Sequence, residues 1–153
     1  MVAFVERFGT TKERLEILDG FLTFRGMLDA VVNIELQWVD GSFLEEDLVR
    51  APRDIDVLTV FSTPKVPNFD PAAHSDLFVP ASSKLRFKTD AHYVSINHPR
   101  GFCRQIAYWI QLFSHSRRGQ IWKGMVELPP ICADEGQGAQ LVLERITALG
   151  STP

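Results

Sequence analysis

Residues 10–13 are polar, Thr-Thr-Lys-Glu, and hydrophobic residues follow them at helical spacing. Thr10 as the N-cap and Glu13 three residues later form the pattern of a capping box. We therefore expect a helix through about Ala30, with four side chains on its buried side: Leu15, Leu18, Phe21 and Leu22. Gly20 and Gly26 weaken this helix, and a break at either glycine is compatible with the pattern.

Two further helices are predicted in the second half of the chain. Residues 97–99, Asn-His-Pro, open the first, and five apolar residues follow at helical spacing on one face: Phe102, Ile106, Trp109, Ile110 and Phe113. Residues 117–119, Arg-Arg-Gly, should end it. We expect the last helix from about Gly138 to Leu149, and residues 151–153 should fray.

Alternation of apolar and polar positions predicts strands. Residues 34–38 alternate as Ile-Glu-Leu-Gln-Trp, which is the pattern of a half-buried strand. Residues 55–61 are rich in β-branched side chains and predict a central strand. Residues 85–96 are expected to form one or two strands. Residues 121–128 predict another, stopped by two prolines.

The segments between these elements are more polar. Residues 43–52 should be a connector, with room for one helical turn at 44–49. Residues 63–83 contain four prolines and should be mostly loop, apart from a short helix from Asp70-Pro71 to Leu77. The order of elements predicts an α+β fold, a small mixed β-sheet with helices packed against it. We expect a single domain over residues 1–150.

Composition narrows the function classes. Apolar residues make up 45% of the chain and charged residues 23%, which is typical of globular proteins. A net charge of -3 argues against broad coating of nucleic acid but permits a local basic patch. Cys103 and Cys132 lack zinc-site spacing, so we expect reduced thiols. Apolar runs stay below the roughly 18 residues of a membrane span, and Glu6 and Arg7 argue against a secretory signal. We therefore expect a cytoplasmic protein.

The most informative motif couples a Gly-Ser turn to a pair of acids. Gly41 and Ser42 end the first predicted strand, and Asp54 and Asp56 open the second, with residues 43–53 between them. Side chains two residues apart on a strand share a face, so these carboxylates repel each other unless a cation lies between them. Oxygen ligands of this kind suit Mg²⁺ or Mn²⁺. The Gly-Ser turn offers N–H groups and a hydroxyl to a polyphosphate.

Gly41-Ser42, the eleven-residue gap and Asp54-Ile55-Asp56 resemble the signature of the nucleotidyltransferase superfamily with the DNA-polymerase-beta-like fold. That family places Gly-Ser at the end of its first sheet strand and the paired acids on the second. The context at residues 38–43 and the segment at 119–124 resemble a small bacterial branch of unassigned function. The resemblance implies a minimal nucleotidyltransferase-like fold. It also implies transfer of a nucleoside monophosphate from a nucleoside triphosphate to a hydroxyl on RNA or on a protein.

The resemblance further implies that three carboxylates clamp two divalent metal ions. Asp54 and Asp56 match the first two positions. The third acid should lie on a neighbouring strand, where Asp90 is the acid within residues 85–96 and Glu127 is the reserve. The alternative that the third metal ligand is missing or substituted stays open, because the neighbours of Asp90 are less apolar than the family pattern prefers.

Basic residues add one candidate. Lys123 falls within the last predicted strand beside Gly124, where a phosphate contact competes with a solvated position. Three basic residues alternate with apolar ones and would share a strand face that we expect to be solvated: Lys84, Arg86 and Lys88.

The remaining candidates are interpreted as structural. For Asp40 we favour a turn-forming role over a metal ligand. His92 is interpreted as a surface or satisfied histidine, and Trp109 and Phe113 as core.

A second function stays open from a different class. The chain could be a catalytically degenerate nucleotide- or partner-binding module of a two-protein toxin–antitoxin or phage-defence system, alone or as a homo- or hetero-oligomer. The position of Asp90 separates the two hypotheses. Convergence with Asp54 and Asp56 favours the enzyme, and a side chain that points away favours the binding module.

Overall fold

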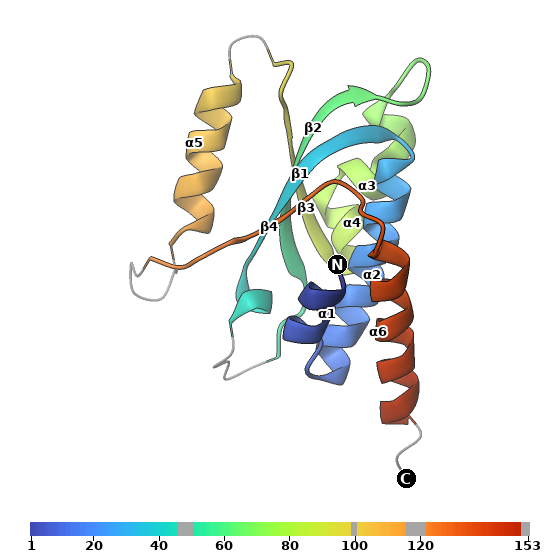
Figure 1. The fold of residues 1–153 in the computed structure, drawn as a ribbon. Coiled ribbons are helices and arrows are strands. Elements are labelled where there is room, and N and C mark those ends of the chain that lie inside the picture. Colours follow the sequence, from blue (N-terminus) through green and yellow to red (C-terminus); the bar gives the residue numbers. More distant parts are fainter. Residues whose placement is uncertain (46–50, 99–100, 116–121, 151–153) are drawn as a thin grey trace.

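The structure, a computed structural model, describes residues 1–45, 51–98, 101–115 and 122–150. It has the predicted α+β fold, in which a mixed sheet carries helices on both faces (Figure 1). Of the described helices, α5 (Phe102–Phe113) alone covers one face, and the other α-helices gather on the opposite side. The predictions for residues 46–50, 99–100, 116–121 and 151–153 lie outside the described residues. No helix of the described part is both long and apolar enough to cross a membrane.

Within the described ranges the sheet has four strands, in the order β3-β2-β1-β4. Strand β1 (Val32–Asp40) pairs antiparallel with β2 (Ile55–Pro64) and with β4 (Val126–Leu128), while β2 runs parallel to β3 (Thr89–Ser95). Both central strands extend beyond their predicted limits. Strand β4 is shorter than predicted, and Trp122 pairs with His115 in an isolated bridge outside the sheet.

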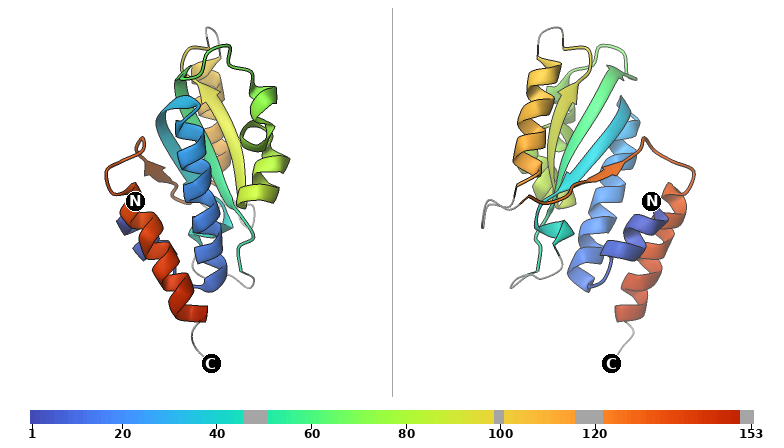
Figure 2. Two further views of the ribbon diagram at one scale, coloured as in Figure 1. Left: turned by 90° about the vertical axis from the view of Figure 1, so that its right-hand side faces the viewer. Right: turned by 60° about the vertical axis from the view of Figure 1, so that its left-hand side comes forward.

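On the other side of the sheet, helix α2 (Lys12–Asp29) packs against the strands, α6 (Glu135–Gly150) lies beside α2, and α1 (Val2–Phe8) packs against α6 (Figure 2). Helix α1 was not predicted, and α6 starts before its predicted limit. The N-cap of α2 is Thr11 instead of Thr10, and its side chain accepts a hydrogen bond from the Arg14 N–H.

Helix α2 runs unbroken through both of its glycines. A Cβ at Gly20 would lie 2.2 Å from the carbonyl oxygen of Phe87. This glycine therefore lets α2 pass closely against the end of the helix that contains Phe87, a contact that the hydrophobic pattern could not reveal.

The stretch from residue 71 to residue 87 is more helical than predicted. The predicted short helix is confirmed as a 3₁₀ turn, η2 (Pro71–His74), followed by α3 (Ser75–Phe78). It begins at Asp70, whose carboxylate accepts a hydrogen bond from the Ala72 N–H. The strand predicted from residue 85 is wrong up to residue 87, which ends α4 (Pro80–Phe87). Pro80 opens this helix, and Lys88 ends it in the left-handed conformation, so five alternating residues misled the prediction.

Helix α5 (Phe102–Phe113) confirms the predicted helix, but it is shorter than predicted: it begins at Phe102 instead of at residues 97–99 and ends at Phe113, before the predicted stop at residues 117–119. Four of its five predicted apolar residues pack in a small cluster with the sheet: Phe102, Ile106, Trp109 and Phe113. Ile110 is instead 41% exposed. The cluster also contains Leu58 of β2, which identifies the face of the sheet that α5 covers.

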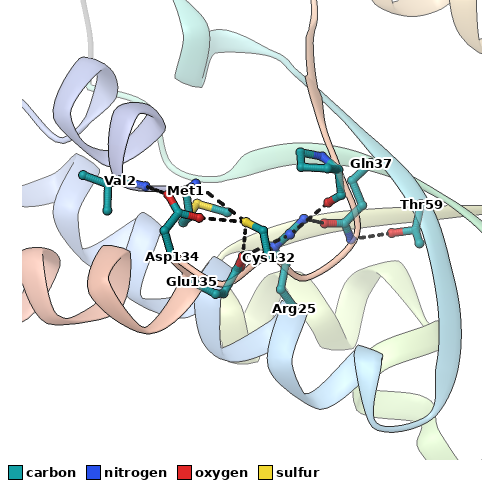
Figure 3. Close-up of polar contacts among 9 residues, drawn as sticks. Met1, Val2, Arg25, Gln37, Thr59, Cys132, Asp134 and Glu135 are labelled. Carbon is teal, nitrogen blue, oxygen red and sulfur yellow. Dashed lines mark hydrogen bonds and ion pairs between the residues drawn. The ribbon is translucent and has the colours of Figure 1, made fainter.

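A buried arginine ties the other face of the sheet to the helices (Figure 3). The Arg25 side chain of α2 is fully buried, and its Nε lies 2.6 Å from Glu135 Oε1 at the start of α6. Its Nη1 donates to the Gln37 side chain of β1, which donates in turn to the Thr59 hydroxyl of β2. Three elements distant in sequence are therefore held by one guanidinium group.

Candidate active site at the ends of the central strands

Aspartates from three neighbouring strands stand directly opposite one another. Asp56 of β2 is paired with Asp40 of β1 on one side and with Asp90 of β3 on the other. Directly opposed residues point to the same face of a sheet, and Asp54 shares that face because it precedes Asp56 by two residues. Leu58, two residues after Asp56, packs with α5. The four carboxylates therefore gather on the α5 side of the sheet.

These carboxylates line a cavity of about 560 Å³ between the sheet and α5. The cavity brings together all six residues that the sequence singled out for the site: Gly41, Ser42, Asp54, Asp56, Asp90 and Lys123. Its opposite wall is aromatic and comes from α5, with Tyr108, Trp109 and Phe113. The cavity thus combines an acidic floor with a wall suited to a flat apolar group.

Gly41 lies between β1 and a 3₁₀ turn, η1 (Ser42–Leu44), as the Gly-Ser motif predicts. Its φ of 85° and ψ of −172° belong to a region that is essentially restricted to glycine. A Cβ at this position would also lie 1.8 Å from Asp56 Oδ2. The glycine therefore allows the turn to approach the central carboxylate, and this contact joins the two motifs in space.

Replacing Gly41 tests this contact. We expect Gly41→Ala to lower the free energy of unfolding by about 3 kcal/mol, because strained φ and ψ and a collision with Asp56 act together. Gly26→Ala is the matched control, since Gly26 is exposed on α2 with open space around it and should gain up to about 1 kcal/mol. Urea denaturation measures both, and equal stabilities for the two variants would contradict the close approach.

The central carboxylate, Asp56, has a raised pKa. Burial, together with the negative charges of Asp54, Asp90 and Asp40, raises the pKa of Asp56 from 3.8 to about 6, and Lys84 opposes the shift. The charged form is thus disfavoured until a positive charge arrives near Asp56.

Lys84 of α4 reaches into this cluster. Its Nζ lies 2.7 Å from Asp54 Oδ2 and 2.9 Å from Asp90 Oδ2, so one ammonium group bridges the acid just before β2 and the acid in β3. The sequence prediction of a solvated strand lysine is wrong, because helix α4 rather than a strand carries it. Among the described residues, no three His, Cys, Asp or Glu side chains are grouped to hold a metal ion in this arrangement.

Lys123 forms a second ion pair at the cavity. It lies before β4 rather than within a strand, and its Nζ is 2.8 Å from Asp40 Oδ1. Asp40 is the last residue of β1 and is 4% exposed, so it belongs to the site and not only to the turn that the sequence interpretation favoured. Burial raises the pKa of Asp40, while Lys123 opposes that shift.

His92 of β3 also faces the cavity. Its Nε2 lies 3.3 Å from Asp90 Oδ1, and its ring packs on Trp109 at 4.5 Å between centroids. Burial lowers the pKa of His92 despite the nearby Asp90 charge. Phe113 is buried core as predicted, but the half-buried Trp109 is also part of the cavity wall. The two-residue spacing from Asp90 to His92 within one predicted strand was the signal that could have found His92, because residues two apart on a strand share a face.

The reserve acid does not join the cluster. Glu127 accepts a hydrogen bond from the Trp38 indole N–H at 2.9 Å and does not line the cavity. The third position of the sequence prediction therefore falls to Asp90, whose strand runs beside that of Asp54 and Asp56.

Comparison with known proteins gives a family but no activity. Neither a curated protein nor a solved structure matches this chain. One family matches residues 1–129, which include every residue of the cavity named above. The chain belongs to this family, the family of unknown function DUF6932.

Proposed function

We propose that this protein is a metal-dependent nucleotidyltransferase that moves a nucleoside monophosphate from a nucleoside triphosphate to a hydroxyl group. The observation that supports it best is the register of Asp40, Asp56 and Asp90 beside the Gly41 turn. The proposal rests on the chemistry of these groups and on the motif resemblance, and RNA or a protein remains the expected acceptor.

The donor set suits a hard divalent cation. Asp54, Asp56 and Asp90 offer only carboxylate oxygens, which Mg²⁺ and Mn²⁺ prefer, and the Lys84 ammonium that bridges two of them supports a role for these oxygens as cation ligands. These three residues would hold the metal. Bound there, it would neutralise phosphate charge and activate the attacking hydroxyl.

The chain's own groups would position the triphosphate. The turn at Gly41 and Ser42 offers backbone N–H groups and a hydroxyl beside the acids, and Lys123 supplies a positive charge on the same cavity. The α5 wall excludes water from one side, and Trp109 offers a flat surface there. Each of these groups acts by binding and orienting rather than by forming a covalent bond.

Lys123→Ala should weaken triphosphate binding by about tenfold, because one charge-assisted contact to phosphate is lost. Lys65→Ala is the matched control, since Lys65 pairs with Asp29 and does not line the cavity. Isothermal titration with a non-hydrolysable triphosphate and Mg²⁺ measures both affinities. If the triphosphate affinity of Lys123→Ala is unchanged, Lys123 does not bind the phosphates and only forms its ion pair with Asp40.

Radiolabelled transfer is the direct test of the proposed function. Each α-³²P nucleoside triphosphate is offered with Mg²⁺ or Mn²⁺ to total RNA and to candidate partner proteins. Label should pass to one acceptor class with the wild-type chain and be absent with Asp56→Asn. A complete lack of transfer combined with retained triphosphate binding would favour a second candidate, the degenerate binding module. The Lys84 bridge also favours this module, because the ammonium pairs with two of the three proposed metal ligands.

A further inference from the structure

Lys84 occupies the space in which Asp54 and Asp90 would share a cation. Its Nζ is within 2.9 Å of one oxygen of each carboxylate, and these acids come from just before β2 and from β3. The lysine ammonium is thus anchored at two of the three proposed metal ligands.

We infer that Lys84 and the divalent metal exclude each other, so that metal binding requires Lys84 to leave Asp54 and Asp90. This inference rests on the proposed function, because it assigns a regulatory role within the same site. The oxygens that would bind the metal are the oxygens that bind the ammonium. A divalent ion placed among these acids would also repel the ammonium at close range.

The geometry allows the lysine to move without unfolding the protein. The Lys84 side chain is 47% exposed, and it lies in the last turn of α4 on a long flexible stem. Its displaced ammonium remains at the cavity wall, where the phosphates of a bound triphosphate offer it a new partner. Lys84 loses its ion pairs with Asp54 and Asp90 when the metal binds, and a contact with the triphosphate replaces them. Metal and triphosphate should therefore bind cooperatively.

Mn²⁺ affinity measured by electron paramagnetic resonance tests this exclusion without any activity assay. Without nucleotide, we expect Lys84→Met to bind Mn²⁺ about tenfold more tightly than the wild type, because two partly exposed ion pairs no longer compete. Lys84→Arg keeps the charge and should stay close to the wild type. A non-hydrolysable triphosphate should tighten Mn²⁺ binding more in the wild type than in Lys84→Met.

Lys88→Met is the matched control, because it removes the same charge next to the same helix while Lys88 pairs with Glu16 away from the cavity. Its Mn²⁺ affinity should equal that of the wild type. Equal affinities in wild type and Lys84→Met, both lost in Asp56→Asn, would overturn the exclusion and leave the proposed metal site standing. If neither the wild type nor any variant binds Mn²⁺, the exclusion and the proposed metal site are both overturned. Weaker Mn²⁺ binding in Lys84→Met than in the wild type would overturn the exclusion alone, because Lys84 would then support metal binding instead of competing with it.

Discussion

Asp56→Asn is expected to lower the proposed nucleotidyl transfer by about a thousandfold or more while making the metal-free protein more stable. Asp56 is the central carboxylate, paired with Asp40 and Asp90 on its two sides and touched by the Gly41 turn. An amide keeps this shape but cannot neutralise a metal ion. The labelled-triphosphate assay measures the loss of transfer. If the transfer rate of Asp56→Asn at saturating Mg²⁺ is within tenfold of the wild-type rate, Asp56 is not required for the proposed reaction.

The gain in stability follows from the raised pKa of Asp56. The pKa is about 6 in the folded protein and near 3.8 in the unfolded chain, so the folded state holds its proton more tightly. The stabilising effect of that proton is complete below about pH 4 and is lost as the pH rises through 6, at a cost of about 3 kcal/mol at most. Asp56→Asn should therefore be more stable than the parent at pH 8, with a difference that disappears near pH 4. Urea denaturation at both pH values measures it, and a difference independent of pH would contradict the assigned cause.

Arg25→Met is expected to lower the free energy of unfolding by about 3–5 kcal/mol. The guanidinium is fully buried, and its removal leaves Glu135 and Gln37 without their charged partner beneath the sheet. Methionine restores most of the volume, so the loss reports the polar contacts more than a cavity. Thermal denaturation should show a midpoint lower by roughly 10 °C.

Arg86→Met is the matched control for that substitution. Arg86 is 54% exposed and pairs with Asp76 at the surface of α4, so its replacement should change stability by less than about 1 kcal/mol. If both variants lose the same amount, the buried arginine contributes no more than a surface ion pair, and its role in holding α2, β1 and α6 together is wrong.

Local patterns predicted the parts of the fold that local physics controls. Helix α5 and strands β1 and β2 have strong periodicity, and their predicted positions are confirmed. Helix α4 was missed because its short alternation of basic and apolar residues fits a strand equally well. Pro80 was the available signal, since proline is favoured in the first turn of a helix.

The site was predictable as far as its motifs reached. Gly41, Asp54 and Asp56 were found from their spacing, and Asp90 from its expected strand. Asp40 and Lys84 were not assigned to the site, because their roles arise from pairing between strands and from a helix that the pattern did not reveal. The register between strands that are distant in sequence is a property of the folded sheet, and it cannot be predicted from a single sequence.

Thermal stability with metal and triphosphate tests the central claim, that these aspartates bind a metal–triphosphate complex. Mn²⁺ at ten times its Kd should stabilise the parent by about 1.4 kcal/mol, or roughly 3–6 °C, and a non-hydrolysable triphosphate should add to this shift. The double variant Asp54→Asn/Asp56→Asn should melt higher than the metal-free parent and should respond to neither addition. Equal shifts in the parent and the double variant would show that the two aspartates are not a metal site.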